Sequence, residues 1–220
     1  MAQGDLNTTS YVILGLLVSR DWSAYEIAEQ VGRGVAEVWP RADRQRYNTP
    51  KRLLERGLVT ARADAVGTQR SRTVYSITPE GRTALEDWLN TACRSSSLEF
   101  EGMIRVIFAE QGSIADLRTT LTTIGEQARQ SRALFVGHAE RMLQPDHGTF
   151  PDREHLMALA NRFMVGHFTH MAQWSEWALA ETENWSDTVE PAVTEHERSR
   201  EIFEGSIDQG KPAHGGAMHE

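Results

Sequence analysis

The sequence lacks the features of disulfide-linked and membrane-spanning proteins. Its 220 residues include one cysteine, Cys93, which excludes an internal disulfide and a cysteine-based zinc site. The longest apolar run, Tyr11–Val18, is far shorter than the ~20 residues that cross a bilayer. Met1–Asn7 is short, polar and without a cationic start, unlike a signal peptide. We therefore expect a cytoplasmic protein with no membrane partner.

Sequence motifs that mark enzymes are also missing. The chain has no phosphate-binding glycine loop, no nucleophile elbow and no HExxH zinc pair. Its scattered acids form no spaced acid–base pair. We therefore expect neither catalysis nor a cofactor. The composition, 40% hydrophobic and 25% charged, is that of a globular protein with a core.

Charge is divided unequally along the chain. Against 23 Lys and Arg stand 31 Asp and Glu, a formal charge of −8, but residues 1–97 carry +2 and residues 98–220 carry −10. Between Arg33 and Arg72 ten basic side chains face four acidic ones. Such asymmetry is typical of a polyanion-binding module joined to another module. A solvated cationic face without a partner is the alternative.

The start of the chain predicts three helices. Asn7–Ser10 supplies N-cap candidates for the run Tyr11–Val18, which we expect in the middle of its domain because apolar residues surround the whole helix. Ser23 and Glu26 fit a capping box that opens a second helix. The expected inward side chains of that helix are Tyr25, Ile27, Ala28 and Val31. A third helical stretch covers roughly residues 41–56.

Two short strands and a fourth helix follow. Val59–Asp64 and Thr73–Ile77 alternate as strands do, and Ala65–Arg72 forms the turn between them. Thr78 and Pro79 then mark the start of a helix. The order α-α-α-β-β-α is that of a winged helix-turn-helix with a two-stranded wing. We expect this mainly α domain to cover residues 1–94.

Cationic and amide side chains gather on one face of the third helical stretch, opposite Tyr47, Pro50 and Leu54. Arginine pairs with guanine, and Asn and Gln pair with adenine, in the major groove of DNA. Lys51 lies to the side and suits a phosphate. The predicted DNA-binding residues of this stretch and the wing are Arg41, Arg44, Gln45, Arg46, Asn48, Lys51, Arg52, Arg70 and Arg72. Solvent-facing helices also carry Arg and Gln, so the face alone is weak evidence.

Pro50 complicates this stretch, because proline inside a helix removes a hydrogen bond and costs ~3 kcal/mol. One interpretation is a kink near Arg46–Pro50, which keeps Tyr47 and Leu54 on one buried face. The other is that Thr49 and Pro50 form a cap and first turn, which splits the stretch into two short helices. The kink is the favoured interpretation.

Four segments of the first half resemble PadR-type transcriptional regulators. They are Ser10–Leu17 (SYVILGLL), Ser23–Ile27 (SAYEI), Tyr47–Leu53 with Gly57–Val59, and Val74–Gly81 (VYSITPEG). The resemblance implies a dimeric winged-helix repressor, often released from its operator by a small molecule or stress signal. It also implies a recognition helix at Arg41–Arg52 and a wing at Ala65–Arg72. The chain departs from the pattern at Ala24, where glycine is frequent, and at Pro50, where leucine is common.

The second half predicts long amphipathic helices after a hinge at Ser95–Ser97. One long helix opens at the capping box of Ser113 and Asp116 and stops at Pro145; another runs to about Trp185. The expected inward stripe of the second is Leu156, Leu159, Phe163, His167, His170, Trp174 and Trp177. Narrow seams on two helices cannot complete a core, so we expect a C2 homodimer. The resemblance agrees, since Glu101–Gly112 looks like the dimerising region of the larger PadR-like subgroup.

The predicted dimerisation residues are Phe100, Ile104, Ile107, Ile114, Leu117, Leu121, Ile124 and Phe135. They belong to a helical dimerisation and effector domain at residues 98–188. Residues 189–220 form a C-terminal segment, with one more helix at Val193–Ile207. We expect residues 209–220 to be disordered, because they have no apolar stripe.

Histidines and aromatics on the last long helix allow two interpretations. His167-x-x-His170 suggests a metal, but helical zinc pairs are more convincing at i, i+4 with a third ligand, so core histidines are favoured and no metal is predicted. The aromatics either pack plainly or line a pocket for a flat organic effector. The residues of that pocket are Phe163, His167, His170, Met171, Trp174 and Trp177.

The sequence therefore predicts a DNA-binding transcriptional regulator. We expect a repressor that binds an inverted-repeat operator as a homodimer and is released by a small aromatic or hydrophobic effector. The alternative is a protein-interaction scaffold that keeps a winged helix without binding DNA.

Overall fold

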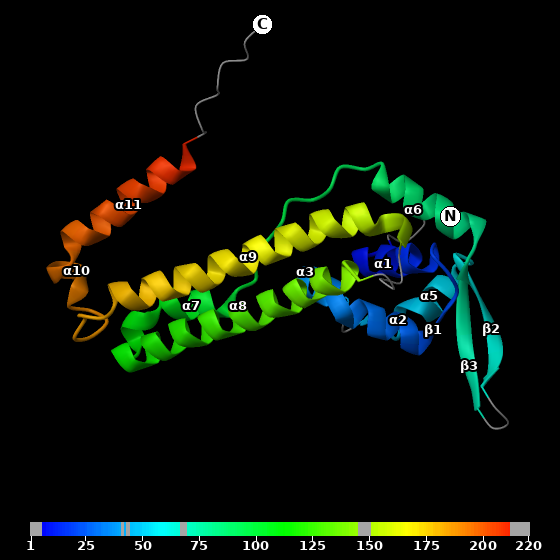
Figure 1. The fold of residues 1–220 in the computed structure, drawn as a ribbon, viewed down its shortest axis with the longest axis horizontal. Helices are drawn as coiled ribbons and strands as arrows, with labels where there is room; N and C mark the ends of the chain where they lie inside the picture. Colours follow the sequence, from blue (N-terminus) through cyan, green and yellow to red (C-terminus); the bar gives the residue numbers. More distant parts are fainter. Residues whose placement is uncertain (1–5, 41, 43–44, 67–69, 145–150, 212–220) are drawn as a thin grey trace, which may run out of the picture. The chain divides into compact units, whose positions relative to one another are not determined.

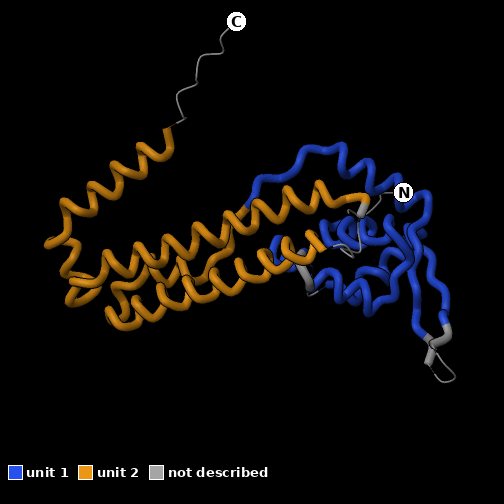
Figure 2. Tube along the Cα trace, viewed as in Figure 1, with its two compact units in different colours: residues 1–96 blue, residues 97–220 orange. Residues whose placement is uncertain are grey.

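The computed structural model describes residues 6–40, 42, 45–66, 70–144 and 151–211. The chain divides into two compact units, Met1–Ser96 and Ser97–Glu220, drawn in different colours in Figure 2. The first unit combines helices with a small sheet, and the second is helical among its described residues (Figure 1).

Helix α1 (Thr8–Leu17) forms the centre of the first unit. Asn7 caps it, because the Asn7 side chain accepts a hydrogen bond from the Ser10 N–H at 2.9 Å. Apolar side chains are buried around most of the helix, and α5 and α6 both pack against it. The expectation of a central first helix is confirmed.

Helix α2 (Ala24–Gln30) begins with the predicted capping box of Ser23 and Glu26. A π-helical turn, η1 (Val31–Val35), continues it into α3 (Ala36–Val38). Ile27, Ala28 and Val31 are buried as expected, but Tyr25 is 72% exposed, so the expectation for Tyr25 is wrong. At 100° per residue, Tyr25 lies roughly 110° from the centre of the face that the other three residues share.

The wing belongs to a three-stranded antiparallel sheet in the order β1-β3-β2. β2 (Val59–Val66) and β3 (Arg70–Ile77) form the predicted hairpin with longer strands than expected. β1 (Trp22–Ser23) adds a third strand, because Trp22 pairs with Tyr75 and Ser23 with Val74. Two residues are too short to show an alternating pattern, so strand periodicity could not predict β1. After β3, Thr78 caps α6 (Pro79–Leu89) as predicted.

Pro50 lies in the first turn of α5 (Thr49–Glu55), so the favoured kinked helix is wrong and the first-turn alternative is correct, although Asn48 rather than Thr49 is the N-cap. Residues 46–48 form a turn before α5. The N–H groups of a first turn have no partner inside their helix, so proline there sacrifices no hydrogen bond. Tyr47 and Leu54 consequently do not share a buried face, being 54% and 41% exposed. Gly57, with φ of 71°, ends the segment in the left-handed region.

The second unit is built on two long helices that pack along each other, α8 (Ile114–Met142) and α9 (Glu154–Glu181) (Figure 1). The predicted capping box of Ser113 and Asp116 opens α8. α7 (Glu101–Ile107) and the 3₁₀ turn η2 (Ala109–Gln111) precede α8, and the turn η3 (Pro151–Arg153) precedes α9.

Two buried clusters hold α8 and α9 together. One centres on Phe135 and Phe168, whose ring centroids lie 5.9 Å apart, and the other on Leu121 and Ala178. Between the clusters the helix backbones approach closely, since a Cβ added at Gly125 would lie 2.5 Å from the Ser175 Oγ. Small residues at this crossing therefore set the distance between the two helices.

Helix α9 packs on α8 with a different face from the predicted one. Its buried residues are Met164, Phe168, Ala172, Ser175 and Ala178. Leu156, Leu159 and Phe163 are 54%, 71% and 68% exposed, so the expectation that they point inward is wrong for the single chain. The helix has two apolar sides, and the sequence pattern alone did not show which one faces α8.

Two further helices follow, α10 (Pro191–Thr194) and α11 (His196–Gly210). They correspond to the helix expected over Val193–Ile207. Arg198 of α11 donates to both carboxylate oxygens of Glu181 at the end of α9, at 2.6 and 3.0 Å. Gln209 and Gly210, expected to be disordered, still belong to α11; residues 212–220 lie outside the described part of the chain.

Candidate nucleic-acid interface

Helix α5 has one side in the core and one side in solvent. Thr49, Pro50 and Leu53 are buried, and the helix packs against α1. Asn48 and Arg52 are exposed one turn apart, joined by the Arg52 N–H, which donates to the Asn48 carbonyl at 3.3 Å. Lys51 is exposed beside them. The first turn of α5 therefore offers an amide, an ammonium and a guanidinium group to a partner.

Gln45 and Arg46 have neighbours within the fold. The Asn7 Nδ2 donates to the Gln45 Oε1 at 2.7 Å, which ties the start of α1 to the turn before α5. The Arg46 Nη1 donates to the Ala28 carbonyl of α2 at 3.4 Å, and its guanidinium carbon lies 5.2 Å from the centre of the Tyr47 ring. Both side chains are half-buried. Arg41 and Arg44 lie outside the described residues.

The wing carries its cations close to acidic groups. Asp64 of β2 lies directly opposite Arg72 of β3, and its Oδ2 accepts hydrogen bonds from the Arg72 Nε at 3.1 Å and Nη2 at 3.0 Å. Arg62, two residues before Asp64, donates to the Asp21 carboxylate at 3.3 Å. Arg62 was not among the predicted DNA-binding residues, although strand alternation from Asp64 and Arg72 points to it. Arg70 begins β3, and its side chain lies outside the described part.

Glu26 is the fixed anion at the base of the wing. The Ser23 N–H and hydroxyl donate to its Oε2 at 2.8 and 2.6 Å, and these bonds, together with the nearby charges of Arg20 and Arg72, hold the pKa of Glu26 below its ordinary value. The Arg72 Nη1 lies 4.0 Å from the same oxygen. Glu26 therefore stays ionised at neutral pH.

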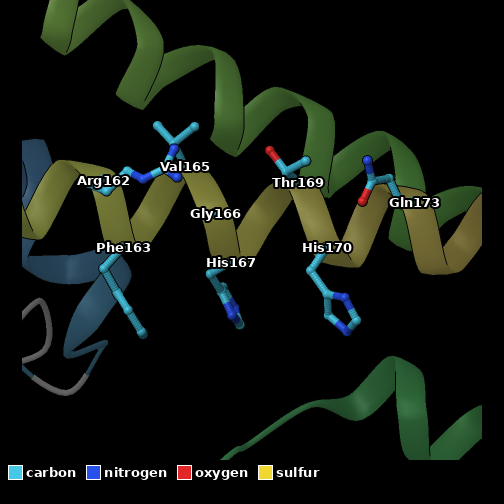
Figure 3. A pocket seen from close by; sticks show the side chains of 8 residues that line it. All are labelled: Arg162, Phe163, Val165, Gly166, His167, Thr169, His170 and Gln173. Atoms are coloured by element: carbon cyan, nitrogen blue, oxygen red, sulfur yellow. The ribbon is translucent and has the colours of Figure 1, made fainter. Parts of the chain in front are cut away.

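The residues of the predicted effector pocket lie on two sides of α9. Phe163, His167 and His170 project from one side of α9, and Arg162 lies on the opposite side in that view; residues of both sides line an open depression along the helix (Figure 3). The other three differ. Met171 and Trp174 pack against the buried clusters between α8 and α9, and Trp177 is 41% exposed.

The predicted dimerisation residues also divide into two groups. Leu117, Leu121, Ile124 and Phe135 are buried on α8 at 6% exposure or less; Ile124 lies beside Gly102 of α7, and the other three belong to the clusters shared with α9. Phe100 and Ile114 are half-buried. Ile104 and Ile107 of α7 are 53% and 59% exposed. In the single chain, α7 and the outer side of α9 thus carry exposed apolar side chains.

Among the described residues, no three His, Cys, Asp or Glu side chains gather closely enough to hold a metal ion. Within the same ranges no helix combines the length and apolarity that a bilayer crossing requires.

Part of the chain matches a known protein family. Residues 13–87 match the model of the transcriptional regulator PadR-like family, which is a family of regulators rather than of enzymes. The negative transcriptional regulator PadR of Bacillus subtilis is 31% identical over 84 residues, which are 38% of this chain and 46% of that protein. The match thus spans about half the length of the curated relative.

Solved structures share the fold over a longer stretch. Bacillus subtilis PadR in complex with operator DNA is similar with a TM-score of 0.66 and 24% identity, covering 80% of this chain and 99% of that one. The same protein in complex with p-coumaric acid matches with a TM-score of 0.62 and 22% identity, covering 81% and 100%. At these identities the likeness shows a common fold.

Proposed function

Since this chain is a PadR-like transcriptional regulator, we propose that it binds double-stranded DNA as a homodimer through α5 and the wing, and represses transcription there. The observation that carries the proposal is the exposed edge of Asn48, Lys51 and Arg52 on α5. In a winged helix this element enters the major groove while the wing contacts the adjacent backbone. The negative regulator among the relatives supports the repressor role.

The roles of the three side chains follow from their chemistry. An arginine pairs bidentately with guanine and an asparagine with adenine, so Arg52 and Asn48 contact base edges. Lys51 is a compact charge and contacts a phosphate. Gln45 and Arg46, which have partners inside the fold, position α5, and Arg72 supplies a wing contact to the backbone.

Two copies of the chain extend the site. The exposed apolar side chains of α7 and of the outer side of α9 form the dimer seam, with Leu159 and Phe163 as its largest exposed groups on α9. A twofold axis then repeats α5, and two recognition helices about 34 Å apart, or a multiple of that distance, read an inverted repeat. The buried predicted residues of α8 support the seam from inside the chain.

Salt dependence tests DNA binding directly. Each phosphate neutralised changes the slope of log affinity against log salt by about 0.9. Lys51→Ala in both protomers therefore reduces the slope by about 1.8 and weakens binding to specific and scrambled duplexes alike. Lys211→Ala is the matched control, because Lys51 and Lys211 are the two lysines of the chain and Lys211 lies in the other unit. A Lys51→Ala slope equal to that of the control contradicts the proposed contact.

Base reading needs a different variant. Arg52→Ala lowers affinity for the specific site by about 1–3 kcal/mol and relaxes the base preference, while binding to scrambled DNA changes little. Sequencing of genomic fragments bound by the purified protein supplies the specific site. A scaffold that does not use DNA yields no enriched fragments and no salt-dependent binding, and this result favours the alternative function.

A small-molecule effector is the second part of the proposal. Beside the seam residue Phe163, the depression offers His167, His170 and Arg162, whose hydrogen-bonding and cationic groups suit a flat aromatic acid. The p-coumaric acid bound to a relative supports this ligand class. Titration of p-coumaric acid against the fluorescence of the partly exposed Trp177 tests it, and Arg162→Ala weakens any response. Unchanged emission and unchanged DNA affinity at millimolar p-coumaric acid contradict an effector of this kind.

A further inference from the structure

Six charged side chains form a chain of alternating sign along the root of the wing. The order is Asp21, Arg62, Asp64, Arg72, Glu26 and Arg20, with successive nitrogen–oxygen distances of 3.3, 3.9, 3.0, 4.0 and 3.8 Å. Three positive and three negative groups leave no net charge. The wing root is therefore neutral in the free chain, although the surrounding segment of the sequence is strongly basic.

The strand register explains why the acids reach the arginines. Asp64 faces Arg72 and Arg62 faces Val74, so these four side chains share one face of the hairpin. Val74 is buried at 4% exposure, which anchors that face to the core beside α2. Glu26 then completes the row from the first turn of α2, where the capping box fixes its carboxylate.

Arg72 is the cation most firmly held in this row. Two of its nitrogens donate to the same oxygen of Asp64, and a third nitrogen lies 4.0 Å from Glu26. A guanidinium held by this pair of bonds has a fixed orientation. Its side chain is nevertheless 49% exposed, so a phosphate has access to it once it leaves Asp64.

We propose that Asp64 restrains Arg72 in the free protein and so lowers the affinity of the wing for DNA phosphates. The inference rests on the proposed DNA binding and adds a residue that sets its strength. An exposed ion pair changes an equilibrium constant by about fivefold at most. A DNA phosphate can therefore displace Asp64 from Arg72, and the cost of breaking this ion pair lowers the affinity for DNA only modestly. Asp64 thereby weakens sequence-independent binding, which depends on phosphate contacts.

Asp64→Asn tests the restraint, because it removes the charge and keeps the shape. The probe is a random 30-base-pair duplex titrated with the full-length chain between about 50 and 200 mM salt. We expect about two- to fivefold tighter binding at low salt. The log–log slope stays at the wild-type value, because Arg72 neutralises the same phosphate in both chains once DNA is bound.

Two comparisons separate this effect from a general change of charge. Glu126→Gln, at an exposed position of α8 in the other unit, makes the same charge change outside the wing's unit and leaves affinity within twofold. In an Arg72→Ala background, Asp64→Asn brings no gain, because the restrained group is absent. Circular dichroism confirms that each variant is folded.

The outcomes distinguish a failure of the Asp64 restraint from a failure of the proposed DNA binding. If the wild-type chain binds the duplex and Asp64→Asn binds equally or more weakly, DNA binding stands and the restraint is wrong. A gain that persists without Arg72 also overturns the restraint. If neither the wild type nor Asp64→Asn binds at about 50 mM salt, both the restraint and the proposed function are wrong.

Discussion

The exposed apolar side of α9 leads to a quantitative prediction about the stability of the proposed homodimer. Leu159 and Phe163 lie four residues apart, on one face of the helix, and are 71% and 68% exposed in the single chain. A second copy packed on this face removes both side chains from water. The double variant Leu159→Ala with Phe163→Ala therefore weakens the proposed dimer without opening the α8–α9 core.

The size of the effect follows from the exposed fractions. Full burial of a leucine or phenylalanine side chain contributes about 2 kcal/mol. Roughly two-thirds of each side chain is exposed in the single chain, so burial of that part in the dimer contributes about 1.4 kcal/mol. Two such side chains in two protomers contribute about 5–6 kcal/mol. Since 1.36 kcal/mol is a factor of ten, the dissociation constant rises by about 10⁴ if the face is fully covered, and by about 10² if half of it is.

Light scattering over 0.1–100 μM measures this change against a chain mass of 24.7 kDa. The wild type is expected at twice this mass and the double variant at the single mass. Phe203→Ala is the matched control, because Phe203 on α11 is 71% exposed but lies outside the proposed seam. A double variant that dissociates no more readily than the control refutes the reasoning, and a wild-type monomer refutes the dimer.

Two predictions concern stability. Gly125→Ala places a Cβ 2.5 Å from the Ser175 Oγ and destabilises the α8–α9 pair by about 1–3 kcal/mol, whereas Gly137→Ala on the same helix meets nothing closer than 3.6 Å and stabilises it by up to about 1 kcal/mol. Thermal midpoints that move in the same direction contradict this account of the packing. Glu26 has a folded pKa below its ordinary 4.5, so its stabilisation is complete above that pH and disappears as the pH falls through the folded value. Melting curves between pH 3 and 7 are expected to show a shallower acid loss for Glu26→Gln, and a pH profile parallel to that of the wild type opposes the prediction.

Local signals in the sequence predicted much of the fold. The capping boxes at Ser23 and Ser113 fixed two helix starts, and Thr78 fixed a third, because each motif satisfies backbone groups within one turn. Strand alternation located the hairpin, and Gly57 located the end of α5. These features depend on residues a few positions apart, which a single sequence displays directly.

Features that depend on distant partners were harder to predict. Pro50 is compatible with a kink or a first turn, and the tertiary packing of Thr49 and Leu53 on α1 decides for the first turn. Helix α9 has apolar residues on two sides, and the choice between them depends on α8. β1 exists only because β3 lies beside it.

The candidate interface shows the same limit. Helical periodicity placed Asn48 and Arg52 on one face with Lys51 to the side, and all three are exposed at the start of α5, where Asn48 is the N-cap. It did not show that Gln45 is bonded to Asn7, 38 residues away, or that Arg72 is held by Asp64. Charge counting identified a basic segment but missed the neutral root of the wing.

The salt dependence of DNA binding by the wild-type chain tests the central claim most directly. Two protomers with Lys51 and one wing arginine each at phosphates neutralise at least four phosphates, so the account predicts a linear fall of log affinity with log salt and a slope of about −3.6 or steeper. A flat response between about 50 and 200 mM salt, or no binding at the lower concentration, contradicts the account.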